Sequence, residues 1–258
     1  MAAIDFTILW PALLAGLLVL ATHVPLGQVV LARGIIFIDI AVAQIAGMGV
    51  IAAGQFGWEA EGWTVQIAAG LAALAAAMLF NLCEKRWPEI LEALIGIAFV
   101  LASSGSILLL AGNPHGGEHL KELLVGQILW VSTDQLLHTA LLYALVLALW
   151  FGLRERLGRP GFYLLFAIAV TASVQLVGVY LVFASLIVPA LAVRRCRGGN
   201  RLPLAYAIGA AGYVAGLLLS FIFDLPTGAI TVWSLATAGL LASLLVTALK
   251  YRSARAEA

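Results

Sequence analysis

The sequence predicts an all-α membrane protein: a polytopic bundle of 8–9 transmembrane helices with at least one broken helix or short helix pair. Of its 258 residues, 63% are hydrophobic and only 10% are charged, whereas a soluble domain carries about 25% charged residues. Several uncharged stretches reach the roughly 20 residues that a membrane-spanning helix needs. The polar connections between them are short, so we expect residues 1–258 to form a single transmembrane domain. This composition excludes a soluble globular domain, a disordered chain and a nucleic-acid binder.

Eight apolar stretches are the expected elements, and each is justified by its length without charge, apart from Asp39 in the second. They cover residues 6–32, 34–58, 62–83, 93–115, 135–153, 161–193, 202–223 and 225–249. Residues 1–5 carry no basic side chain, so the first stretch is expected to be a retained span and not a cleaved signal. Arg33 demands a tight turn after this span, and Pro25 is the expected place of a break.

The stretch 161–193 does not fit a simple span. It is flanked by Arg159 and Arg194, which both indicate the same side of the membrane, yet it is too short for two full crossings of about 20 residues each. A broken helix, or two short helices, satisfies both constraints. We expect the break near the polar residues Thr171, Ser173 and Gln175, because interrupted backbone at membrane depth must be buried in protein or line a cavity. Interrupted helices recur at transport sites.

The distribution of charge predicts the orientation. Every lysine and arginine except Lys121 falls in one alternating set of connections, and most acids fall in the other set. The positive-inside rule therefore places the basic set and the C-terminus in the cytoplasm. Cys83 and Cys196 lie on that reducing side and are expected to be inert thiols.

The chain shows no energy source of its own. A phosphate-binding Walker A loop needs a lysine followed by Ser or Thr, and the three lysines are followed by Arg86, Glu122 and Tyr251. A proton- or sodium-coupled carrier would bury several ionisable groups in its spans, and only Asp39 lies clearly inside one. The expectation is a permease without enzymatic activity, driven by separate ATPase subunits.

Four regions of the sequence carry a family resemblance. They are residues 33–49, which include Asp39 and Gln44; residues 92–97, which begin at Glu92; residues 124–132; and a group formed by 175–179, 185–190 and 224–228. In order and spacing they resemble the permease subunits of bacterial ATP-binding-cassette importers for zinc, manganese and iron. The resemblance implies a multi-pass protein of the bacterial inner membrane that acts as a homodimer, with two cytoplasmic ATPase subunits that hydrolyse the ATP and an extracytoplasmic metal-binding protein.

The same resemblance reveals a departure. The family has a histidine one helical turn after its Asp. If Asp39 matches that Asp, the position of the histidine falls at Ala43. If the match shifts by one residue, Ile40 takes the position of the Asp and Gln44 takes that of the histidine. Alanine cannot ligate a metal, and a neutral amide is a weak zinc ligand compared with imidazole. By resemblance, Pro189 with Arg194, Arg195 and Arg197 forms the segment that docks on the ATPase, although the positive-inside rule alone also explains this charge.

Asp39, Gln44, Glu92 and Gln175 are the predicted substrate-pathway residues. A carboxylate inside a span costs roughly 2.5–3.5 kcal/mol on an insertion scale, so Asp39 is expected to be functional or paired. The structural alternative is a partnership with Arg33. Gln44 is as well explained by an interhelical hydrogen bond, and Glu92 by an interfacial position beside Arg86.

A second candidate site lies between two apolar stretches. His115, Glu118 and His119 combine two imidazoles and a carboxylate within five residues, which suits a zinc-type ion at the outer face. The alternative is an ordinary polar loop that docks the binding protein.

The predicted function is the membrane subunit of an importer of divalent transition-metal ions, with no permanently bound cofactor. Zinc is the favoured ion because histidines are expected at the outer face, and manganese and iron are the next candidates. Three alternatives stay open: the same architecture carrying a metal chelate or organic substrate, a membrane scaffold without transport, and a secondary carrier.

Overall fold

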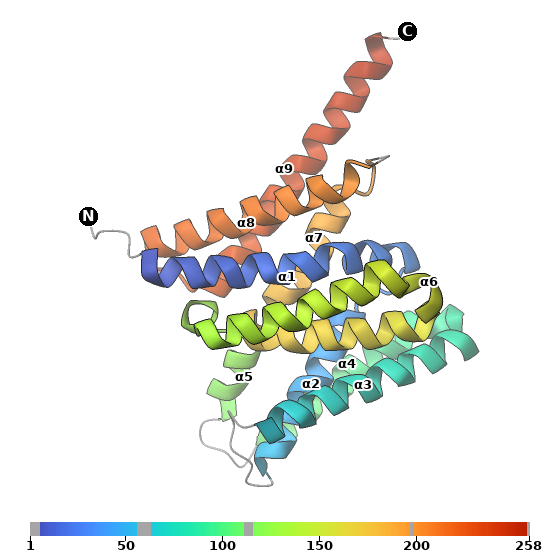
Figure 1. Ribbon diagram of the computed structural model, residues 1–258, viewed down its shortest axis with the longest axis vertical. Helices are drawn as coiled ribbons and strands as arrows, with labels where there is room; N and C mark the ends of the chain where they lie inside the picture. The colour runs from blue at the N-terminus through green and yellow to red at the C-terminus, as the bar shows by residue number, and fades with distance from the viewer. Residues whose placement is uncertain (1–5, 56–62, 111–115, 197–198, 257–258) are drawn as a thin grey trace.

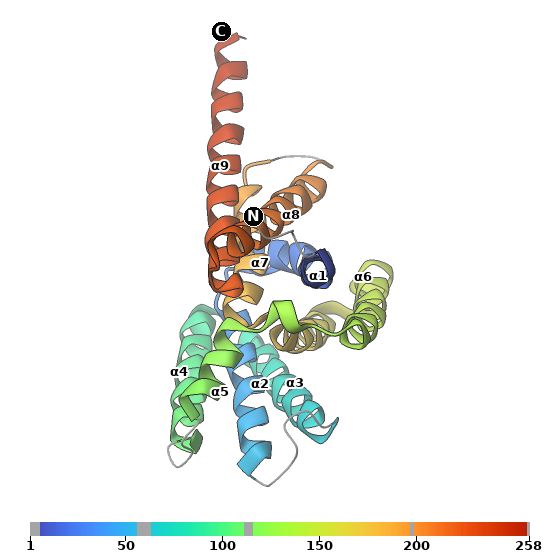
Figure 2. The ribbon, with the colours of Figure 1, turned by 90° about the vertical axis from the view of Figure 1, so that its left-hand side faces the viewer.

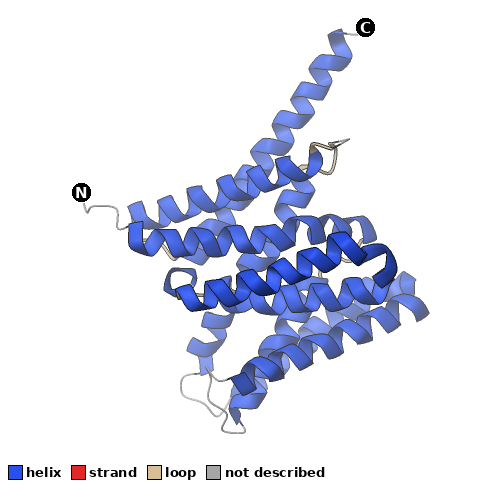
Figure 3. Cartoon of the chain, in the orientation of Figure 1, coloured by secondary structure: helices blue, strands red, loops and turns tan. Residues whose placement is uncertain are grey.

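The computed structural model describes residues 6–55, 63–110, 116–196 and 199–256, and within these ranges every regular element is a helix (Figure 3). The elements in chain order are α1 (Phe6–Arg33), α2 (Ile38–Gln55), α3 (Trp63–Arg86), η1 (Pro88–Ile90), α4 (Leu91–Leu110), α5 (Gly116–Val125), η2 (Ile128–Trp130), α6 (Thr133–Val177), α7 (Val179–Ala192), α8 (Arg201–Phe223) and α9 (Thr227–Ala256). The prediction of an all-α membrane fold is confirmed.

Eight helical segments of the described chain are long and apolar enough to cross a membrane, and α6 supplies two of them. The apolar helix α7 is shorter, with 14 residues, and is not among the eight. Two ends of the bundle can be distinguished. We call the end that holds Arg33, the end of α3 and the bend of α6 the basic end, and the opposite end, with α5 and η2, the acidic end (Figure 1).

The apolar stretch 161–193 is indeed interrupted. The break falls at Gly178, between α6 and α7, a few residues beyond the polar positions at which it was expected. Gly178 has φ 80° and ψ 162°, a region of backbone conformation that is essentially restricted to glycine. A second glycine, Gly158 with φ 57° and ψ −149°, bends α6 between its two membrane-spanning halves.

The expected break at Pro25 is wrong, because α1 continues through both Pro11 and Pro25 to Arg33. The chain turns only after Gly34, whose φ of 72° is a conformation that glycine adopts without a steric penalty. Ile35 N–H donates to the carbonyl of Val30, a pattern that commonly closes helix C-termini at a glycine.

The core is formed where α1, α7 and α8 approach one another closely. A side chain placed at Gly27 would collide with the backbone of Leu186 on α7, and one at Gly209 would collide with Leu20 on α1. Gly216 meets Thr231 of α9 in the same way. Small residues permit such close contact between membrane helices. The C-terminal part of α9 extends clear of the bundle (Figures 1 and 2).

Candidate functional site

The corner between α1 and α2 lies at the basic end and brings together several contacts of charged side chains. Arg33 is the last residue of α1, Phe37 precedes the first residue of α2, and Asp39 lies in the first turn of α2. The turn is short, so these three residues share one end of the bundle. Side chains from α3, α4 and α6 contact it.

Arg33 is engaged by two other helices. Its guanidinium nitrogen lies 3.7 Å from a carboxylate oxygen of Glu84 near the end of α3, with both side chains largely buried. The guanidinium also lies over the ring of Phe162 on α6, 4.4 Å from its centroid. Both interactions are favourable, and the aromatic one is stronger where water is excluded. The structural alternative for Asp39, a partnership with Arg33, is not what the structure shows, because among the described residues neither Asp39 oxygen has a hydrogen-bond partner and the ion pair of Arg33 is with Glu84.

Glu92 contacts the same corner from α4. Its Oε1 accepts a hydrogen bond of 3.2 Å from the backbone N–H of Phe37, just before α2 begins. The N–H groups at a helix start have no partner within the helix, and a carboxylate there is favoured by the helix dipole. Glu92 thus acts as a cap supplied by a neighbouring helix, a specific contact that the sequence did not predict.

Asp39 itself is buried, with 1% of its surface exposed. Neither carboxylate oxygen has a hydrogen-bond partner within the described part of the chain. Buried polar groups in proteins are almost always satisfied, and an exception calls for a bound water, an ion or a functional role. Among the described residues, both Asp39 oxygens are without such a partner inside a membrane-spanning helix, and the facing atoms of Arg33 and Glu84 at the same corner attract each other at 3.7 Å without a hydrogen bond.

The other predicted pathway residues are distributed along the bundle. Gln44 is buried on α2, five residues beyond Asp39, whereas Gln175 is exposed near the far end of α6. The structure brings Asp39 and Glu92 to one corner and leaves Gln175 apart from it.

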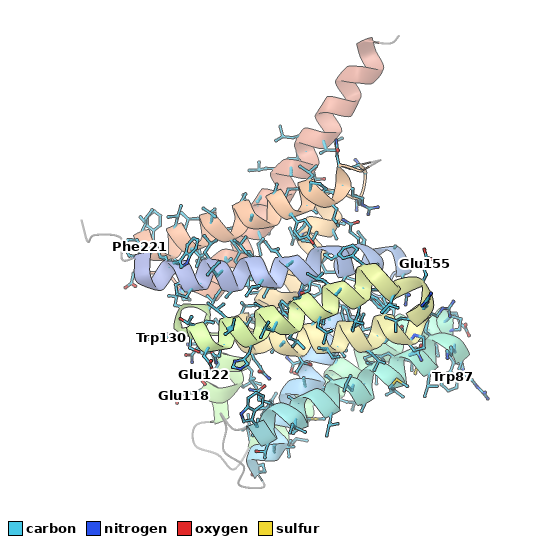
Figure 4. The ribbon with its side chains drawn as sticks, in the orientation of Figure 1. Trp87, Glu118, Glu122, Trp130, Glu155 and Phe221 are labelled. Carbon is cyan, nitrogen blue, oxygen red and sulfur yellow. The ribbon has the colours of Figure 1, made fainter. Side chains whose placement is uncertain are left out.

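The predicted histidine cluster is only partly visible. His115 and the side chain of His119 lie outside the described residues, and Glu118 is exposed on α5. Among the side chains that the structure describes, no three from His, Cys, Asp and Glu gather closely enough to hold a metal ion. Figure 4 shows Glu118 and Glu122 on α5 near Trp130, at the acidic end. The metal-binding role of His115, Glu118 and His119 remains a prediction.

The predicted ATPase-docking segment begins near the C-terminal end of α7 and continues into the connection between α7 and α8. Pro189 is buried in α7, Arg194 and Arg195 are exposed in the following turn, and Arg197 lies outside the described residues. Arg195 donates a hydrogen bond of 3.3 Å to the hydroxyl of Thr247. This contact attaches the α7–α8 connection to α9.

A second junction lies at the acidic end, where three chain segments meet at glycines. A side chain at Gly126 would collide with Val177 and Gly178, one at Gly178 with Gly126, and one at Gly228 with Val125. The same segments, residues 125–130 and 224–228, line a hollow of about 380 Å³. This junction consists of backbone packed directly against backbone.

Sequence reasoning missed Glu84. It stands beside Lys85 and Arg86, so the charge pattern placed it in a basic connection, and nothing in that pattern indicates a partly buried ion pair with Arg33. Helical spacing offers one signal, because Glu84 follows the buried residues Ala77, Phe80 and Asn81 on the same side of α3.

Comparison with known proteins agrees with this architecture. The model of the ABC 3 transport family matches residues 5–160 and 151–246. A curated Haemophilus influenzae protein, named "Probable iron transport system membrane protein", is 30% identical over 133 residues, which cover 43% of this chain and 49% of that protein. The chain thus spans about half the length of the curated relative it matches.

Two solved structures share the fold. PsaBC from Streptococcus pneumoniae, in complex with Fab, matches with a TM-score of 0.73 and 22% identity, over 92% of this chain and 91% of that chain. An inward-facing transporter described as of the metal-chelate ABC type matches with a TM-score of 0.61 and 20% identity, over 94% and 85%.

Proposed function

The chain belongs to the ABC 3 transport family, and from that premise we propose that it is the membrane-spanning permease subunit of an ATP-driven importer of divalent transition-metal ions. Its role is to move the ion through the bundle while a separate ATPase subunit hydrolyses ATP. The observation that carries the proposal is Asp39, a buried carboxylate with two unused oxygens in a membrane-spanning helix. Intramembrane ionisable groups of this kind mark ion pathways.

The proposed mechanism is alternating access in a dimer of this chain, embedded in the bacterial inner membrane with its basic end in the cytoplasm. A binding protein delivers the ion at the acidic end. ATP-driven closure of the partner subunits is transmitted through Pro189, Arg194, Arg195 and Arg197, and the contact between Arg195 and Thr247 carries the movement to α9. Asp39 holds the ion only briefly, because conduction requires a site weak enough to release it.

The cargo we propose is zinc, manganese or iron. The histidines predicted at the acidic end favour zinc, which takes nitrogen ligands readily. The oxygen atoms of Asp39 suit manganese and iron at least as well. Cellular metal content separates the three ions directly.

The experiment expresses the chain with its cognate ATPase and binding protein, and measures cellular metals by mass spectrometry. We expect one divalent metal to rise with the wild type, and Asp39→Asn to reduce that rise roughly 10- to 100-fold, the range in which changes around metal sites act. Asp134→Asn is the matched control, because Asp134 is an exposed carboxylate at the acidic end. Metal accumulation that is equal with Asp39→Asn and wild type would contradict the role of Asp39.

A metal chelate is the second candidate cargo, and one structural observation favours it. An apolar groove of about 590 Å³ runs between α2 and α4, and its lining residues are Phe37, Ile40, Ala93, Gly96, Ile97, Phe99, Val100 and Leu101. An organic ligand shell would find apolar contacts there that a bare ion does not need. In this case uptake of the chelate persists in Asp39→Asn.

A further inference from the structure

Asp39 occupies a place in which a carboxylate ordinarily takes a structural role. It lies in the first turn of α2, where an acidic side chain can cap the helix. The second role open to it is an ion pair with Arg33, which stands six residues earlier, on the other side of a single short turn. Either role would occupy the carboxylate oxygens, yet neither oxygen has a hydrogen-bond partner among the residues that the structure describes.

Two glutamates from neighbouring helices take those roles instead. Glu92 accepts the N–H of Phe37 at the start of α2. Glu84 lies 3.7 Å from Arg33, and the ring of Phe162 lies on the face of the same guanidinium. Because Arg33 is 25% exposed and Glu84 only 14%, little water screens the attraction between them.

We propose that Glu84 is a positioning residue that keeps Arg33 away from Asp39, and so preserves Asp39 as a free ligand for the transported ion. Removing one partner of a buried ion pair leaves the other charge uncompensated, which is strongly unfavourable. In the absence of Glu84, Asp39 is an unpaired carboxylate at the same end of the bundle, and Arg33 turns to it. This inference rests on the proposed role of Asp39.

The test is a double-mutant comparison with the complete transporter in liposomes, supplied separately with Zn²⁺, Mn²⁺ and Fe²⁺. Glu84→Gln is expected to raise the KM for the transported metal roughly tenfold or more, because Arg33 competes with the ion for Asp39. Adding Arg33→Gln to the same protein removes the competitor and is expected to return the KM close to the wild-type value. A purely structural ion pair would also be relieved in the double variant, because no uncompensated charge remains, so the thermal midpoint is measured alongside. The inference requires the KM of Glu84→Gln to rise, whereas a purely structural pair lowers the thermal midpoint and leaves the KM of the folded transporter at the wild-type value.

The controls separate this inference from the proposed function. No uptake of any of the three metals by the wild type would refute the proposed function itself. Uptake that Asp39→Asn reduces, but that Glu84→Gln leaves unchanged or that the double variant fails to restore, would overturn the inference alone. Asp134→Asn, which removes a carboxylate from the exposed pair with His138, should leave the KM unchanged.

A second variant covers a failure of Glu84→Gln to fold. Phe162→Leu removes the ring on which Arg33 rests and leaves Glu84 in place. It is expected to raise the KM in the same direction by a smaller factor, and Arg33→Gln in the same protein is expected to reverse the change. A rise that Arg33→Gln does not reverse would also overturn the inference.

Discussion

The α1–α2 corner and the glycine junction at the acidic end both interrupt the helical pattern, but they are held in opposite ways. At the corner, carboxylates from α3 and α4 and an aromatic ring from α6 hold the turn. At the junction, Gly126, Gly178 and Gly228 bring backbone against backbone, with no room for a side chain. Side-chain contacts can exchange partners while the fold persists, whereas a backbone contact without spare volume cannot. The basic end therefore holds side-chain contacts that can change partners, and the acidic end holds a backbone contact that cannot.

Gly178→Ala is expected to have the largest effect on stability. The substitution forces an alanine into a backbone conformation that only glycine adopts readily, which costs about 1–3 kcal/mol of stability. Its Cβ would also collide with the backbone nitrogen of Gly126. We expect a loss of about 3 kcal/mol or more, measured as a fall in the thermal midpoint in detergent by intrinsic tryptophan fluorescence. An unchanged thermal midpoint would show that the backbone segments of the junction can move apart to accept a methyl group without loss of stability.

Gly158→Ala is the matched variant at the bend of α6. Gly158 also has a positive φ, but a Cβ there would meet no atom closer than 4.0 Å. The expected loss of stability comes from the strained backbone conformation alone and is about 1–3 kcal/mol. The difference in thermal midpoint between the two variants measures the contribution of the backbone contact, and equal losses would exclude such a contribution.

Glu92 offers a test at the charged corner with a smaller expected effect. Glu92→Ala removes the acceptor for the N–H of Phe37 and should cost about 0.5–2 kcal/mol, as the loss of a helix cap does. Glu92→Gln keeps an acceptor oxygen and should retain most of the stability. If Gln is as harmful as Ala, the charge of Glu92 matters and its hydrogen bond does not.

Gly70→Ala should have the smallest effect and the opposite sign. Gly70 lies inside α3 with nothing within 4 Å of an added Cβ. Alanine is favoured over glycine in a helix interior by up to about 1 kcal/mol, so the thermal midpoint should rise slightly. A fall would indicate that this face of α3 contacts another molecule in the assembled transporter.

Much of the fold follows from the sequence, because the bilayer imposes strong rules on composition. The number of spans, the interruption of residues 161–193 and the isolation of Asp39 in an apolar stretch all follow from length and charge. The position of the break does not. The polar side chains of residues 171–175 led to the prediction of a break there. The chain breaks instead at Gly178, where a contact with Gly126 excludes every larger residue.

What the sequence by itself determined is the class of the protein and the presence of one intramembrane carboxylate, since hydrophobicity and helix length act locally along the chain. Only the tertiary structure decided which charges meet. Arg33 is six residues from Asp39 and far from Glu84 in sequence, yet it pairs with Glu84 because α1 and α3 both end at the basic end, within reach of each other's side chains. Pairing depends on distance in space and on burial, and neither quantity is encoded in the spacing of residues along one helix.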